Sequence, residues 1–130
     1  MKILMTGCTG HAGSNALNHF VENGHEVHAL VRPHNIPNLK ERENVKWVSG
    51  GFADSEIISD TAYNCDAVVH IGASHDEEME ELDKNFINSV EHAFNGTGKV
   101  FITTSASVVY NDTNGNPRDE MEPIENPHPL

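Results

Sequence analysis

The hydrophobic residues of this chain fall into short continuous runs, which are separated by segments with helical spacing. The five apolar runs are residues 3–5, 27–31, 45–48, 67–71 and 100–103. Between them, apolar residues recur every three or four positions over residues 12–21 and 79–93, and a shorter helix is predicted around residues 55–62. Asn23-Gly24 and Asn95-Gly96 follow the two longer segments, as is common at the C-terminal ends of helices. This alternation predicts βαβ units and a parallel sheet.

The predicted strands are nearly continuous in apolar character, so we expect helices to cover both faces of the sheet. The fold class is therefore a doubly wound α/β domain. Right-handed crossovers that run one way from the first strand, and the other way after the third, give the strand order 3-2-1-4-5. From residue 111 onward Asn, Asp, Gly and Pro dominate, so residues 111–130 are predicted to be an irregular tail.

Length and charge narrow the possible functions. The 130 residues suit one domain with one core. Eight Lys and Arg against twenty Asp and Glu give a net charge of -12, the wrong sign for binding nucleic acid or an anionic membrane. The acidic residues are densest over residues 76–91, where we expect a solvated helix face.

Cysteine and histidine residues give no pattern typical of a metal site. Cys8 and Cys65 lack paired spacing, and the nine histidines form no HExxH or Cys/His cluster, so no metal is predicted. Cys8 is interpreted as a small loop residue rather than a redox thiol. Without a signal peptide or a long apolar run in the sequence, a cytoplasmic location is expected.

Three glycines, Gly7, Gly10 and Gly13, lie between the first predicted strand and the helix that follows it. In the first βα turn of such a fold, glycines permit a tight turn, close approach of the backbone to a pyrophosphate, and close packing of helix on strand. The first backbone N–H groups of the helix, near His11 and Ala12, would then face an anion. The alternative is a turn that uses glycine only for packing. We favour dinucleotide binding, and hence a Rossmann-like dinucleotide-binding domain over residues 1–110.

The end of the second predicted strand bears on which dinucleotide is bound. An acidic residue there would accept a hydrogen bond from the ribose 2′-hydroxyl of NAD, but this chain has Arg32. A guanidinium suits a 2′-phosphate in charge and geometry. The sequence therefore favours NADP over NAD.

The segments TGCTGHAG, DAVVHIGAS and VFITTSASVVYND together resemble the extended short-chain dehydrogenase/reductases, the NAD-dependent epimerase/dehydratase family. The resemblance covers essentially the whole chain. It implies that Ser105 is the catalytic serine that hydrogen-bonds a substrate carbonyl, with Ser107 as its rival, and that Asn85 supports the site. The residues expected to contact the cofactor are Gly7, Thr9, Gly10, His11, Ala12, Gly13, Arg32, Gly51, Phe52, Ile71, Gly72, Ala73 and Thr103.

Two departures from the family pattern stand out. The family often has Gly-Asp after the third strand, whereas this chain has Gly51-Phe52 there, which leaves a backbone contact to adenine. The family's Tyr-x-x-x-Lys motif is absent, because Tyr63 and Tyr110 are followed four places on by Ala67 and Asn114. We therefore expect either the amino-terminal part of an enzyme, truncated before the Tyr-Lys helix, or a shortened relative.

The resemblance implies an NAD(P)-dependent epimerase, dehydratase or reductase acting on a carbonyl or hydroxyl substrate, such as a nucleotide sugar, and inactive in this 130-residue form. The alternative is a nucleotide-binding sensor or interaction module without catalysis. A third hypothesis is a structural or interaction protein that has kept the fold but no longer binds the ligand. Without further helices, the sheet near the fourth and fifth strands would expose apolar surface, which favours a homo-oligomer.

Overall fold

The computed structural model describes residues 1–73, 78–105, 110, 112–121 and 123–124. Its elements are β1 (Lys2–Thr6), α1 (His11–Glu22), β2 (Glu26–Val31), η1 (Pro33–Asn38), β3 (Val45–Ser49), α2 (Ser55–Tyr63), β4 (Ala67–His70), α3 (Met79–Phe94) and β5 (Val100–Thr103). Every strand and α-helix predicted from the hydrophobic pattern is present, with bounds that differ by at most one residue at either end.

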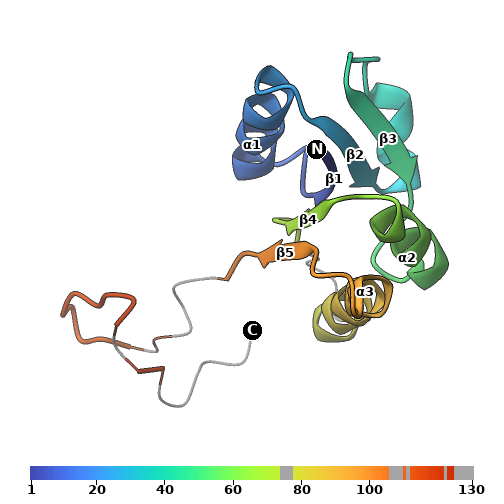
Figure 1. Cartoon of the computed structure of the whole chain (residues 1–130). Helices are drawn as coiled ribbons and strands as arrows, with labels where there is room; N and C mark the ends of the chain where they lie inside the picture. The colour runs from blue at the N-terminus through green and yellow to red at the C-terminus, as the bar shows by residue number, and fades with distance from the viewer. Residues whose placement is uncertain (74–77, 106–109, 111, 122, 125–130) are drawn as a thin grey trace.

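The five strands form one parallel sheet in the order β3-β2-β1-β4-β5, which confirms the predicted fold class and strand order. Figure 1 shows α1 on one face of the sheet and α2 and α3 together on the other. Because β1 lies in the centre, it is hydrogen-bonded to β2 on one side and to β4 on the other. The carboxyl ends of these three strands therefore meet at one edge of the sheet.

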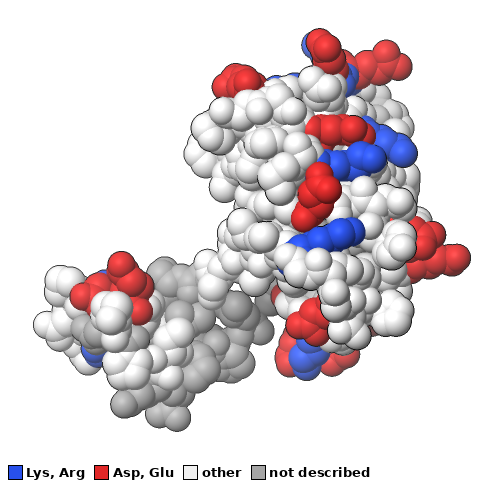
Figure 2. All heavy atoms as spheres, viewed as in Figure 1, with Lys and Arg blue, Asp and Glu red and all other residues white. Residues whose placement is uncertain are grey.

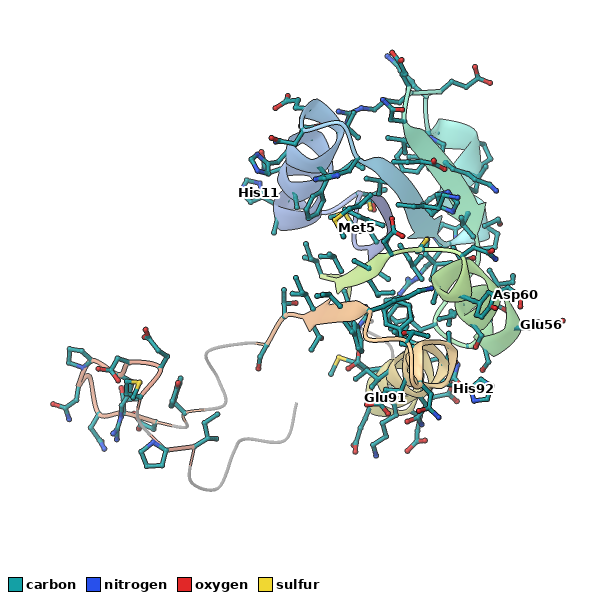
Figure 3. The ribbon with its side chains drawn as sticks, in the orientation of Figure 1. Met5, His11, Glu56, Asp60, Glu91 and His92 are labelled. Atoms are coloured by element: carbon teal, nitrogen blue, oxygen red, sulfur yellow. The ribbon has the colours of Figure 1, made fainter. Side chains whose placement is uncertain are left out.

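Two hydrophobic clusters fill the space between the sheet and its helices. Alternate residues of β1 point to opposite faces, so Ile3 and Met5 pack with Leu17 of α1, while Leu4 packs with Phe86 and other residues of α2 and α3. Figure 3 shows Met5 within the body of the molecule, between α1 and the sheet. Burial on both faces explains why the strand sequences read as continuous apolar runs.

The structure adds one element that the hydrophobic pattern did not indicate. After β2 the chain forms the 3-10 helix η1, which begins at Pro33 and contains Pro37. Proline fixes the backbone φ near the helical value and suits the first turn, so a segment without hydrophobic periodicity still becomes ordered. The predicted fourth strand is one residue shorter than expected, because the backbone N–H of Ile71 donates to the Thr6 hydroxyl at 3.2 Å.

The expected apolar surface near β5 is present. Val100 and Ile102 are 52% and 51% exposed. They pair in register with Ala67 and Val69 of β4, and Val69 belongs to the cluster beneath α1. Val100 and Ile102 therefore lie on the same face of the sheet as α1. Phe101 points to the other face and packs against the cluster under α3.

On the face that Figure 2 shows, acidic side chains lie at several separated places rather than in one patch. On α3, Glu80, Glu81 and Glu91 are exposed, as expected for a solvated helix face. Of the predicted irregular tail, residues 112–121 contain turns and no helix or strand, while residues 111, 122 and 125–130 lie outside the described part of the chain. Among the described helices, none combines the length and apolar character needed to span a bilayer.

Candidate functional site

The loop between β1 and α1 uses two of its glycines for the fold. Gly7 has φ +73°, and a Cβ atom on it would lie 2.6 Å from the backbone nitrogen of Gly72. A Cβ on Gly13 would lie 1.9 Å from the carbonyl oxygen of Gly7, so α1 can approach β1 only because Gly13 has no side chain. These are the tight turn and the close helix packing that the sequence predicted.

Gly10 differs from its two neighbours. It precedes the first helical residue, with an extended backbone at φ -84° that any residue can adopt. A Cβ there would lie 3.3 Å from the Gly7 carbonyl oxygen, which is a tight but minor contact. The fold therefore makes a smaller demand for glycine at residue 10 than at residues 7 and 13.

The N-terminus of α1 has the features of an anion site. Within the described part of the chain, no side chain caps this end, and its first turn holds no acidic residue. The side chain of His11 points away from the sheet (Figure 3). The partial positive charge of the helix end is thus available to a bound anion.

A cleft of about 490 Å³ opens at the carboxyl ends of the strands. Ligands of doubly wound sheets bind at this position. Its lining includes seven of the residues expected to contact a cofactor: Gly7, Thr9, Arg32, Gly51, Phe52, Gly72 and Ala73. These residues come from four loops that are far apart in sequence, so the fold brings together what the sequence analysis had listed separately.

The lining also contains residues that were not predicted to contact a cofactor. His34 and Asn35 come from η1, and Leu82 comes from α3. Their positions depend on the proline-containing turn after β2 and on where α3 crosses the sheet. The prolines in residues 32–38 were the one available signal for a structured segment there.

The cleft is electrostatically unlike the rest of the molecule. The chain carries a net charge of -12, yet no Asp or Glu is among the described residues that line the cleft, whereas Arg32 is. The nearby carboxylate of Asp54 accepts a hydrogen bond from the Gly51 backbone N–H at 2.7 Å. This lining fits an anionic ligand better than a cationic one.

Asn85 of α3 holds the loop that follows β3. Its side-chain amide donates to the carbonyl oxygen of Phe52 at 2.6 Å, and its amide oxygen accepts from the Ser55 hydroxyl at 2.8 Å. One side chain thus joins α3, the start of α2 and a wall of the cleft. The structure gives Asn85 the supporting position that the family resemblance implied.

The other predicted residues lie outside the cleft lining. Thr103 ends β5, and Ser105 follows it as an exposed residue, while Ser107 is outside the described residues. The hydroxyl of Tyr110 donates to the carbonyl oxygen of Asp119 at 3.2 Å. Gly10 and Ile71 each adjoin a lining residue in the chain but are not themselves part of the lining, and neither are His11, Ala12 and Gly13 in the first turn of α1.

Cys8 is among the residues that line the cleft, but its side chain is buried in the cluster beneath α1, with a relative exposure of 3%, and its thiol donates to the Met5 carbonyl oxygen. Burial raises the pKa of Cys8 to about 12, so the thiol stays protonated at neutral pH. This supports its interpretation as a small loop residue. In the described part of the chain, no group of three or more His, Cys, Asp or Glu side chains is placed to hold a metal ion.

Comparison with known proteins places this architecture in a family. The model of the NAD dependent epimerase/dehydratase family matches residues 3–130. An uncharacterized protein of Schizosaccharomyces pombe is 30% identical over 98% of this chain and 44% of its own length. This chain therefore spans less than half the length of that relative.

Solved structures agree on the fold. The dTDP-glucose 4,6-dehydratase of Bacillus anthracis, solved in complex with NAD, superposes with a TM-score of 0.80 at 16% identity, over 99% of this chain and 45% of that one. The Bordetella bronchiseptica enzyme WbmH, solved in complex with NAD+, gives a TM-score of 0.67 at 23% identity, over 85% of this chain and 40% of that one. The family match over residues 3–130 shows that the chain belongs to the NAD-dependent epimerase/dehydratase family.

Proposed function

We propose that this chain binds a dinucleotide in the cleft between β1, β2 and β4, as the nucleotide-binding portion of an NAD(P)-dependent epimerase, dehydratase or reductase. The observation that carries the proposal is the cleft itself: in an acidic protein it is lined by Arg32 and by no described carboxylate, and it adjoins a helix N-terminus without a cap. The loop glycines supply close backbone approach, so the residues present fit a dinucleotide.

Each part of the cofactor has residues proposed to hold it. The backbone N–H groups of His11 and Ala12 would bind the pyrophosphate, while the Gly10 N–H already donates to the Gly7 carbonyl oxygen at 2.9 Å. Gly51 and Phe52 would border the adenine through their backbone. When bound, the nicotinamide would supply hydride transfer. The small residues Gly72 and Ala73 leave room for the cofactor to pass the end of β4.

We further propose that the bound cofactor is NADP(H) rather than NAD(H). Arg32 follows the last residue of β2 and lines the cleft, where a guanidinium would pair with a 2′-phosphate. An acidic residue to accept the free 2′-hydroxyl of NAD is missing from the described lining. The solved relatives named above bind NAD, so this preference would distinguish the present chain from them.

The test is calorimetric titration of the purified chain with NADPH and NADH. We expect tighter binding of NADPH, and a loss of about 10- to 100-fold in NADPH affinity in Arg32→Ala with little change for NADH, because one charge-assisted contact is removed. Lys46→Ala is the matched control, since it removes the same charge from an exposed position on β3 outside the cleft. Equal affinity for both cofactors would refute the NADP preference, and binding of neither would refute the dinucleotide site.

Catalysis by the 130-residue chain is a separate matter. Ser105 is proposed to hydrogen-bond a carbonyl or hydroxyl substrate, such as a nucleotide sugar, but no Tyr-x-x-x-Lys supplies the proton-transfer pair. A second candidate function is a cofactor-binding sensor or interaction module, for which the exposed side chains of Val100 and Ile102 would offer an apolar contact surface. We expect cofactor binding without oxidation of NADPH above a protein-free control, and measurable turnover would rule out the non-catalytic candidate.

A further inference from the structure

Three polar side chains, those of Thr6, His70 and Asp83, form a hydrogen-bonded network beneath the cleft. The family resemblance assigned no role to any of them. The Thr6 hydroxyl is 2.7 Å from Nδ1 of His70, and Nε2 of His70 is 2.8 Å from a carboxylate oxygen of Asp83. Thr6 is fully buried and His70 is 3% exposed, while the Asp83 side chain is 43% exposed. This hydrogen-bonded network thus runs from the end of β1 through the end of β4 to the surface of α3.

The hydrogen bonds determine which nitrogen of His70 carries the proton. The Thr6 oxygen accepts two backbone hydrogen bonds, from Ile71 N–H at 3.2 Å and from Gly72 N–H at 3.0 Å. Both of its lone pairs are then in use, so the hydroxyl hydrogen must be donated to Nδ1 of His70. The proton of the neutral imidazole is therefore on Nε2, which donates to Asp83.

The same contacts fix the shape of the cleft. Gly72 lines it, and its backbone nitrogen lies so close to Gly7 that a Cβ on Gly7 would be only 2.6 Å away. The Thr6 hydroxyl holds this crossing of two backbones, because it bonds Gly72 directly. A displacement of Thr6 would shift two loops that the proposed cofactor touches.

The His70 ring also contacts a wall of the cleft. It stacks on Phe86 with ring centroids 4.2 Å apart and an interplanar angle of 16°. The Phe52 ring meets it edge-on at 5.1 Å, and Phe52 lines the cleft. The carbonyl oxygen of His70 accepts from Thr104 N–H at 3.0 Å, which ties β4 to the end of β5 just before Ser105.

We propose that His70, held as the neutral Nε2–H tautomer between Thr6 and Asp83, is a positioning residue that keeps Gly72 and Phe52 in the geometry that binds the cofactor. This inference rests on the proposed dinucleotide site. Asp83 acts in it only as the acceptor of a hydrogen bond, so its charge is dispensable. The ligand class is a dinucleotide, and the effect is on its affinity.

The tautomer is tested first, by nitrogen-15 NMR of the histidine side chains in the full chain. We expect His70 to show one protonated nitrogen, Nε2, in the wild type and in Asp83→Asn, which keeps an acceptor oxygen. A proton on Nδ1, whether in the other tautomer or in the imidazolium, would overturn the proposal. This measurement does not depend on cofactor binding, so it stands even if the dinucleotide site is refuted.

Affinity is tested with a matched pair at Thr6. Thr6→Val keeps the shape of the side chain and removes the hydroxyl, whereas Thr6→Ser keeps the hydroxyl. We expect Thr6→Val to bind NADPH about tenfold more weakly or worse and to give a mixed His70 tautomer, with Thr6→Ser and Asp83→Asn within about threefold of wild type. If folded Thr6→Val binds like the wild type, the positioning role is wrong. If Thr6→Val does not fold, a loss of affinity well beyond threefold in Asp83→Asn refutes the proposal.

Discussion

At the scale of single residues, the three loop glycines are not equivalent. A Cβ atom on Gly13 would lie only 1.9 Å from the Gly7 carbonyl oxygen. A Cβ atom on Gly10 would lie 3.3 Å from the same oxygen, and the Gly10 backbone has a conformation that any residue can adopt. We expect Gly13→Ala to lower the free energy of unfolding by about 3 kcal/mol, because the added methyl must push α1 off β1. Gly10→Ala should cost less than about 1 kcal/mol. Urea unfolding of both variants measures this difference.

Gly10→Ala should weaken cofactor binding although it costs little stability. A methyl group at residue 10 would stand at the N-terminus of α1, where the pyrophosphate is proposed to lie, so we expect Gly10→Ala to lose about tenfold or more in NADPH affinity while remaining folded. Gly24→Ala, just beyond the far end of the same helix, is the control for binding: its φ of +77° makes the substitution cost stability, but the residue is far from the proposed pyrophosphate site, so affinity should not change. Unchanged affinity in Gly10→Ala would mean that the loop glycines serve packing alone.

At the scale of elements, Asn85 joins α3 to α2 and to the loop after β3. Asn85→Ala removes the hydrogen bonds to the Phe52 carbonyl oxygen and from the Ser55 hydroxyl. We expect a loss of about 1–3 kcal/mol in the free energy of unfolding, because a part-buried carbonyl loses its donor. Hydrogen exchange of the Gly51 and Phe52 amides should become faster, since the loop is then held by fewer contacts. Asn88→Ala, exposed on the same helix, should change neither quantity.

The elements also show what the sequence could and could not predict. Hydrophobic periodicity found every strand and α-helix, because each buries a continuous apolar run or stripe, and the order β3-β2-β1-β4-β5 followed from crossover handedness. It missed η1, whose order comes from the fixed φ of Pro33 and Pro37 rather than from burial. A local conformational preference of this kind leaves no periodic signal.

The cleft, like the fold, could be predicted only in part. Gly7, Arg32 and Gly72 could be proposed because strand ends in this fold converge, and the cleft does contain all three. Leu82 and the contact between His70 and Asp83 could not, because they depend on where α3 crosses the sheet. His70 did carry a signal in the sequence, as a polar residue in an otherwise apolar strand.

At the scale of the whole molecule, the net charge of -12 works against the folded state. Two like charges about 10 Å apart cost about 0.4 kcal/mol in water. The chain carries twenty Asp and Glu against eight Lys and Arg, so repulsion between carboxylates outweighs attraction on average. Salt shortens the screening length from about 30 Å at 0.01 M to about 8 Å at 0.15 M. We therefore expect sodium chloride to raise the free energy of unfolding over this range by about 1 kcal/mol, measured by urea unfolding.

A charge-reduced variant shows whether repulsion is the cause. Glu56 and Glu91 are exposed on α2 and α3, away from the cleft (Figure 3). Glu56→Gln combined with Glu91→Gln should be more stable than wild type at low salt and should gain less from added salt. Sedimentation at each salt concentration checks that association through the exposed Val100 and Ile102 does not contribute. A wild-type stability that stays flat or falls as salt is added would mean that local ion pairs, such as Lys84 with Glu80, outweigh the net repulsion.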